Sequence, residues 1–169
     1  YVTHDQDEAM VLSDHVVLME RGRIVQIDRP EDMYAKPKSL FAAKFLGETN
    51  LFHATVKKCT ARETVAVSDT GVLLRSDGRT AYAEGEKVVV SIRPESMGFG
   101  SSTREAGQSV TGVVEDITFI GSRSFYKVAL EGGQSIRVQV QRNAKAHLPS
   151  NGERTVVSWD ATDVVMLPA

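Results

Sequence analysis

The chain has 169 residues, 41% of them hydrophobic, so it can bury the core of one medium domain or two small ones. Its 20 basic and 22 acidic residues give a net charge of -2, which lacks the positive excess that nucleic-acid binding requires. Because Cys59 is the single cysteine, an internal disulfide is excluded and a reducing cytoplasm is expected. Apolar runs are far shorter than the roughly 20 residues that span a bilayer, so membrane contact must come through a partner.

The first part of the chain has the changing pattern of a compact α/β unit. Residues 1–5 have the character of a buried strand that runs into a helix, so we expect the chain to begin inside a domain. Asp5 is a good helix N-cap, and Glu8 three residues later predicts a capping box and a helix that ends near Leu12. The segments 16–20 and 23–28 then predict a β-hairpin.

Two short helices are predicted next. Pro30 suits the first turn of a helix through Tyr34, and the apolar spacing of residues 40–46 predicts another helix that Gly47 ends. The domain boundary is predicted near residues 47–50.

From Asn50 onward, short alternating segments are separated by Gly, Ser, Asp and Asn, which is typical of an antiparallel β domain. An internal repeat is also predicted, because Gly85–Ile92 aligns with Gly152–Trp159. Two copies of one strand-rich unit predict a Greek-key or OB-like barrel. Strands are expected at residues 52–58, 64–68, 72–75, 87–94, 110–118, 124–130, 134–141, 154–158 and 164–167.

His4 carries the first candidate function. A lone histidine at the end of a strand is more often a hydrogen-bonded structural residue than a catalytic one. Its surroundings, Val-Thr-His-Asp-Gln-Asp-Glu-Ala-Met over residues 2–10, resemble the switch-histidine segment of ABC-transporter ATPases. The resemblance implies that His4 contacts the γ-phosphate of ATP in the full-length protein, where it positions and stabilises rather than acts as a base.

The sequence departs from that family in one large respect. The phosphate loop G-x-x-x-x-G-K-S/T is absent, as are the signature segment and the acidic pair that would hold magnesium. ATP and Mg²⁺ are therefore expected in the full-length protein, and this chain alone is expected to bind no cofactor and to be inactive. Asp5, Asp7 and Glu8 are explained by helix capping and the helix dipole, so we expect no metal site.

A second resemblance covers the rest of the chain. Residues 29–52, which include Phe-Leu-Gly-Glu-Thr-Asn-Leu-Phe, and the turn Arg93-Pro94-Glu95 resemble importer ATPase subunits with an OB-like transport-associated (TOBE) domain. It implies a mainly β fold: residues 1–48 would be the α/β remnant of the ABC ATPase domain and residues 49–169 the OB-like barrel. The closing Ser-Trp-Asp pattern at residues 158–160 adds a resemblance to polyamine importers.

Three residues of the β domain are interface or regulatory candidates. Arg93 and Glu95 flank a proline at the end of a strand, so they form either a local ion pair in a turn or a domain or dimer contact. Trp159 is expected to anchor the core or an interface.

The expected function is the regulatory and dimerisation region of an ABC importer's ATP-hydrolysing subunit, for polyamines such as spermidine or putrescine. The expected partners are a second copy and transmembrane permease subunits, at the cytoplasmic face of the inner membrane. An alternative is an OB-like module that senses an oxyanion or the solute, for which a preformed pocket of backbone donors between the barrel halves is needed. Nucleic-acid binding is disfavoured by the 7% aromatic content and the acidic balance.

Overall fold

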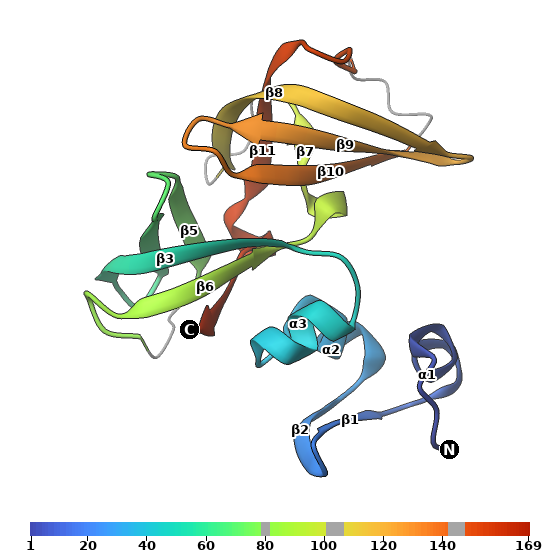
Figure 1. Cartoon of the computed structure of the whole chain (residues 1–169). Helices are drawn as coiled ribbons and strands as arrows, with labels where there is room; N and C mark the ends of the chain where they lie inside the picture. The colour runs from blue at the N-terminus through green and yellow to red at the C-terminus, as the bar shows by residue number, and fades with distance from the viewer. Residues whose placement is uncertain (79–81, 101–106, 142–147) are drawn as a thin grey trace.

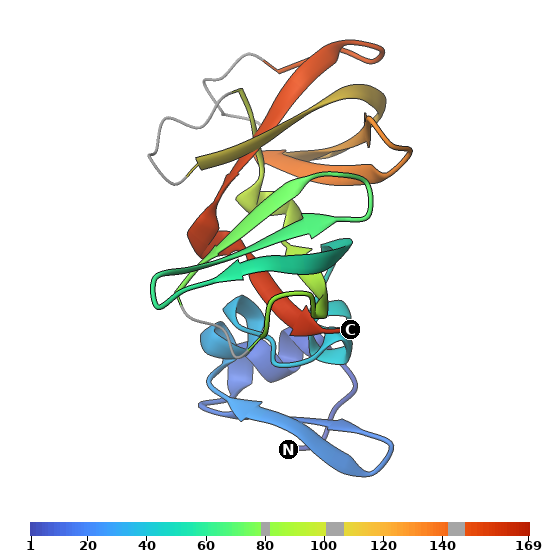
Figure 2. The same ribbon diagram turned by 90° about the vertical axis from the view of Figure 1, so that its left-hand side faces the viewer.

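The computed structural model describes residues 1–78, 82–100, 107–141 and 148–169, and within them the chain is mainly β-structure. Figure 1 shows two curled sheets stacked above a smaller α/β segment, and Figure 2 shows the same arrangement from the side. The chain starts in the α/β segment and ends at the sheet next to it.

The α/β segment is a hairpin flanked by short helices, as the residue pattern predicts. In the hairpin turn, Arg21 and Gly22 both have positive φ angles, 50° and 74°, which suit a two-residue turn between twisted strands. The buried side chains Leu18, Met33, Ala42 and Leu46 form a small core of its own. Its elements are α1 (Gln6–Leu12), β1 (Val16–Glu20), β2 (Arg23–Asp28), α2 (Pro30–Ala35) and α3 (Leu40–Phe45).

The N-terminus of α1 is capped differently from the predicted capping box. The Asp5 carboxylate accepts hydrogen bonds from the backbone N–H groups of Asp7 and Glu8, at 2.9 and 3.1 Å. The Glu8 carboxylate does not return the bond to Asp5. It accepts from the hydroxyls of Tyr1 and Thr3 instead, at 3.0 and 2.8 Å, because Thr3 already accepts the Asp5 N–H at 3.0 Å.

Two five-stranded sheets form the β domain. The first has the order β12-β6-β3-β4-β5, with β3 (Asn50–Cys59), β4 (Glu63–Ser68), β5 (Leu73–Asp77), β6 (Lys87–Ile92) and β12 (Val165–Pro168). The second has the order β10-β9-β8-β11-β7, with β7 (Gly98–Phe99), β8 (Gly107–Ile120), β9 (Arg123–Leu130), β10 (Ser135–Gln141) and β11 (Arg154–Asp160). All the predicted strands are present. The predicted strand at 87–94 ends early, and β7 was not predicted, because two residues are too short to show alternation.

The internal repeat is confirmed by the topology. Each half consists of four antiparallel strands, a 3-10 turn and a final strand, the turns being η1 (Pro94–Ser96) and η2 (Ala161–Asp163). The final strands are exchanged: β7 pairs with β11 of the second half, and β12 pairs with β6 of the first half. Each half also has a register shift at the same place, after Val56 in β3 and after Val114 in β8. This exchange locks the two halves into one domain.

A matched pair of amide side chains joins the two halves at the sheet edges. Asn50 at the start of β3 accepts from the backbone N–H of Arg137 at 2.7 Å and donates to its carbonyl at 2.8 Å. Gln108 occupies the same position in the second half and makes the same two bonds to the backbone of Arg75, at 2.6 and 2.8 Å. These bonds satisfy backbone groups of the edge strands β10 and β5, which would otherwise be open.

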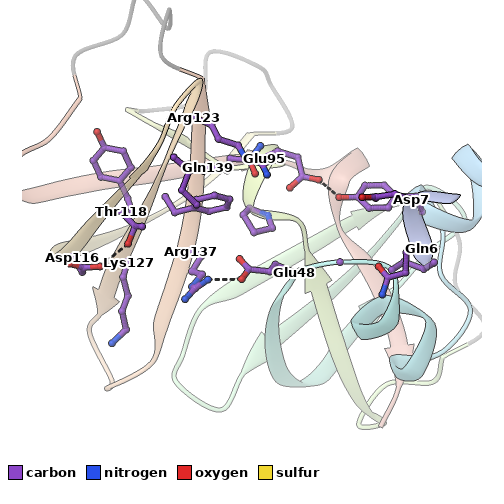
Figure 3. Close-up of a pocket in the computed structure, with 17 residues that line it drawn as sticks. Gln6, Asp7, Glu48, Glu95, Asp116, Thr118, Arg123, Lys127, Arg137 and Gln139 are labelled. Carbon is purple, nitrogen blue, oxygen red and sulfur yellow. Dashed lines mark hydrogen bonds and ion pairs between the residues drawn. The ribbon is translucent and has the colours of Figure 1, made fainter. Parts of the chain in front are cut away.

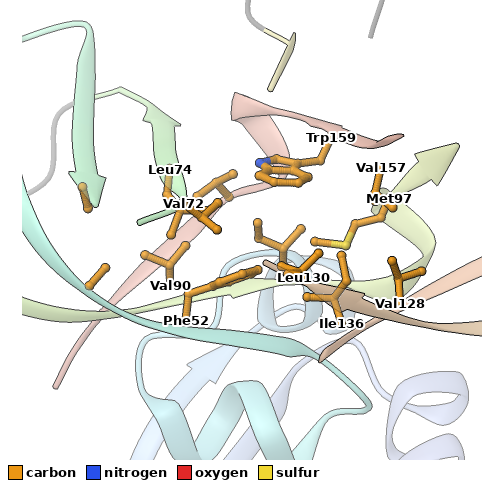
Figure 4. Close-up of a cluster of buried hydrophobic side chains, with 14 of the residues drawn as sticks. Phe52, Val72, Leu74, Val90, Met97, Val128, Leu130, Ile136, Val157 and Trp159 are labelled. Atoms are coloured by element: carbon orange, nitrogen blue, oxygen red, sulfur yellow. The ribbon is translucent and has the colours of Figure 1, made fainter. Parts of the chain in front are cut away.

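The space between the two sheets is filled by aliphatic and aromatic side chains (Figure 4). Phe52 and Val90 from the first sheet face Val157 and Trp159 from the second. Trp159 is only 2% exposed, so it lies in the core, and its indole N–H has no hydrogen-bond partner within the described residues.

Candidate functional site

Arg93 lies at the junction between the α/β segment and the barrel. It follows β6 directly and is only 8% exposed. Its guanidinium donates to the carbonyls of Ala43, Gly47 and Glu48, at 3.0, 3.1 and 3.1 Å. Because the last carbonyls of a helix lack partners within the helix, Arg93 satisfies the end of α3 and the connection that follows it.

Tyr34 completes this junction from α2. Its ring lies 4.2 Å from the Arg93 guanidinium carbon, in the geometry of a cation–π contact, and its hydroxyl donates to the Glu95 carboxylate. Burial, reinforced by the hydrogen bond to Glu95, raises the pKa of Tyr34 to about 12. Burial likewise lowers the pKa of Arg93 below its ordinary value, and the nearby Tyr34 and Glu95 oppose this shift. Arg93 and Glu95 thus meet through Tyr34, in contact with the α/β segment rather than as a local ion pair.

Gly47 allows the backbone conformation found at this junction. Its φ angle is +139°, and a Cβ atom there would lie 3.6 Å from the Tyr34 ring and 3.7 Å from the Arg93 guanidinium. A side chain at this position would therefore be strained whatever the space.

Beside the junction lies an open groove of about 540 Å³ (Figure 3). One wall is the outer face of β8, β9 and β10. The other wall combines Gln6 and Asp7 of α1 with Glu48 and Glu95. The salt bridge between Arg137 and Glu48, at 2.6 Å, crosses from wall to wall and separates this groove from a second one of about 490 Å³. The barrel wall consists of Asp116, Thr118, Ile120, Arg123, Phe125, Tyr126, Lys127, Arg137 and Gln139.

The groove carries both signs of charge. Lys127 pairs with Glu115 at 2.9 Å, and this hydrogen bond, with a second from Ser135, lowers the pKa of Glu115. Arg123 lies 5.5 Å above the Phe125 ring. Asp116 accepts a hydrogen bond from the Thr118 hydroxyl at 3.2 Å. Such an arrangement is suited to binding a charged surface.

The other candidates lie apart from this junction. His4 is exposed and precedes α1, where it borders a cleft of about 480 Å³ formed by residues 1–6 and β1. The structure brings Arg93 and Glu95 together with Tyr34, but places neither His4 nor Trp159 there. The contacts of Tyr34 and of the paired amide side chains Asn50 and Gln108 were not predicted, since their partners are distant in sequence.

The geometry defines a class of protein: a two-sheet, OB-like barrel built from a repeated unit and joined through a buried arginine to an α/β segment. Residues 90–167 match the family model described as the TOBE domain. The cytoplasmic molybdate-binding protein ModG has the same fold, with a TM-score of 0.63 and 21% identity over 71% of this chain and 96% of that chain. Within the described residues, no helix is long and apolar enough to cross a membrane.

Similarity to import ATP-binding proteins extends over nearly the whole chain. The spermidine/putrescine import ATP-binding protein PotA of Rubrobacter xylanophilus is 32% identical over 99% of this chain and 44% of its own length. PotA of Roseobacter denitrificans is 36% identical over 85% of this chain and 39% of its own length. The putrescine transport ATP-binding protein PotG of Escherichia coli K12 is 32% identical over 98% of this chain and 45% of its own length. The chain is thus related to the C-terminal part of importer ATP-binding subunits and spans less than half their length.

Proposed function

We propose that this chain is the regulatory and dimerisation region of the ATP-hydrolysing subunit of an ABC importer for polyamines. The observation that carries the proposal is the similarity to polyamine import ATP-binding proteins across both the α/β segment and the barrel. In the full-length protein, ATP hydrolysis would drive polyamine uptake through permease subunits, with the ATPase peripheral at the cytoplasmic face of the inner membrane. The barrel would hold two ATPase subunits together during the cycle.

The residues present fit only part of an ATP site. The sequence contains no phosphate loop, so the donors that would cradle ATP and Mg²⁺ belong to a part of the protein not found here. His4 is the residue of this chain that would contact the γ-phosphate, and its exposed position before α1 leaves it accessible for that contact. The Arg93 junction would then carry movement of the α/β segment to the barrel.

A chimeric transporter tests the proposal. The matching C-terminal part of E. coli PotG is replaced by this chain, and putrescine uptake is measured in cells that lack PotG. The chimera is expected to restore uptake, and His4→Ala is expected to abolish it. His53→Ala, at an exposed histidine on β3, is the matched control and is expected to leave uptake unchanged. A stably expressed chimera that transports no putrescine would count against the proposal.

A second candidate, the sensing of a small oxyanion, is favoured by the fold shared with molybdate-binding ModG. The space between the sheets, where such a pocket would have to lie, is instead filled by the hydrophobic core. The groove beside the junction places the carboxylates of Asp7, Glu95 and Asp116 among its basic residues, so it does not offer the purely positive surroundings that favour an anion. Calorimetric titration with molybdate separates the two candidates: no heat of binding is expected, and saturable binding would favour the sensor.

A further inference from the structure

Hydrogen bonds fix the backbone on both sides of His4. The residue before it is Thr3, whose hydroxyl donates to the Glu8 carboxylate at 2.8 Å. The residue after it is Asp5, whose backbone N–H donates to the same Thr3 hydroxyl at 3.0 Å. The His4 imidazole itself makes no hydrogen bond or ion pair within the described residues. One hydroxyl therefore links the two neighbours of His4 to each other and, through Glu8, to α1.

The role of Glu8 differs from the one that a helix start requires. In a capping box, Glu8 would accept the N–H of Asp5, and the bond would reach only the residue after His4. Here Glu8 reaches back to Thr3, so the residue before His4 is held as well. The Asp5 carboxylate caps α1 separately, through the N–H groups of Asp7 and Glu8. The helix is thus capped without the Glu8 side chain, which instead fixes the turn that carries His4.

The placement of His4 matters for the contact assigned to it. An error of about 1 Å in the position of a reacting group can cost about a hundredfold in rate. Because the imidazole has no side-chain partner within the described residues, the backbone of the turn sets its position. We propose that Glu8 is a positioning residue for His4: through the Thr3 hydroxyl, it holds the turn at residues 3–5 so that the imidazole meets the γ-phosphate of ATP. The inference rests on the role of His4 in the proposed function and adds the residue through which α1 controls it.

The negative charge of Glu8 offers a competing explanation, in which the carboxylate acts on the site by its field alone. Two replacements separate charge from hydrogen bonding. Glu8→Gln keeps an acceptor oxygen at the same reach without the charge, whereas Glu8→Asp keeps the charge on a side chain that is one methylene shorter. Positioning through Thr3 predicts that the Gln variant keeps its function and that the Asp variant loses it. Control by charge predicts the reverse.

The first measurement is the NMR relaxation order parameter of the His4 and Asp5 backbone amides in this chain, which requires no activity. It is expected to be about 0.85 in the wild type and in Glu8→Gln, and below about 0.6 in Glu8→Met and Thr3→Val. Thr3→Ser restores the hydroxyl and is expected to return the wild-type value. Glu31→Met, at an exposed acid in the first turn of α2, is the matched control and is expected to leave these amides rigid. Amides that stay rigid in Glu8→Met and Thr3→Val would overturn the inference.

The second measurement is ATP hydrolysis by the purified PotG chimera. Glu8→Met is expected to lower kcat by at least about tenfold and to leave KM for ATP within about twofold, because a misplaced His4 weakens the transition state more than binding. Glu8→Gln is expected to keep the wild-type rate, and Glu8→Met is expected to change nothing further in a His4→Ala background. A raised KM with unchanged kcat, or an active Glu8→Asp beside an inactive Glu8→Gln, would contradict positioning. An inactive wild-type chimera counts against the proposed function, whereas the order parameters still decide whether Glu8 fixes the turn.

Discussion

The Arg93 junction makes a prediction whose size follows from the structure. Arg93→Met keeps the length of the side chain and removes the guanidinium, which leaves the carbonyls of Ala43, Gly47 and Glu48 without their donor. Hydrogen bonds to a charged group contribute about 1.5 kcal/mol each at the lower end. About 1–2 kcal/mol returns because a buried charge no longer needs to be desolvated. The net loss is about 3 kcal/mol, or a melting temperature lower by about 6–12 °C for a chain of this size.

Urea unfolding and amide hydrogen exchange together check this prediction. The variant is expected to lose stability and to exchange faster in α3, whose end Arg93 contacts, than in β9. Arg93→Lys keeps the charge but cannot reach all three carbonyls, so an intermediate loss is expected. The matched control is Arg154→Met, which breaks an exposed ion pair and should cost at most about 1 kcal/mol. If Arg93→Met unfolds within about 0.5 kcal/mol of wild type, the junction does not hold the segment to the barrel.

Three further predictions concern other contacts. Because the pKa of Tyr34 is raised to about 12 in the folded chain, folding stability should fall as pH rises from about 10 to about 12. The expected loss is about 1 kcal/mol, since solvent screens part of the effect. Tyr34→Phe should remove this decline when urea unfolding is measured across the same pH range. Asn50→Leu and Gln108→Leu should each cost about 1–3 kcal/mol in thermal unfolding, because each leaves two backbone groups unpaired. Markedly unequal losses would contradict the equivalence of the two amide side chains. Gly112→Ala should cost at least about 2 kcal/mol, since its Cβ would lie 2.6 Å from a backbone oxygen, whereas Gly98→Ala has open space and should be within about 0.5 kcal/mol of wild type.

The strands and short helices were predictable because their signals are local. Alternating apolar residues, glycine-rich turns and capping residues act within a few positions, and they predicted the hairpin at residues 16–28 and the strands from residue 50. The repeat was visible for a similar reason, since equivalent strands need the same residues at the same turns. The capping box was half wrong because Thr3 accepts the bond assigned to Glu8.

The junction was not predictable in its geometry, because it joins residues far apart in sequence. Arg93 was a candidate, yet its partners Ala43 and Glu48 lie 50 and 45 positions away. Asn50 reaches Arg137 across 87 positions. No local pattern marks such contacts, which follow only from how the two halves curl around one core.

The two halves of the barrel differ at a few positions, and these positions bear on the proposed function. Equivalent positions of the two halves need similar residues to build the two sheets. Positions where the halves differ are therefore not constrained by sheet formation. Arg93 corresponds to Asp160, and Glu95 to Thr162, in the aligned turns η1 and η2. The end of the second long hairpin, residues 117–124, likewise has no counterpart in the first half. Glu95 and this hairpin border one groove, on the side where the α/β segment meets the barrel. One barrel side therefore departs from the repeat, and the contact of Arg93 and Glu95 with the α/β segment accounts for the difference at those two positions.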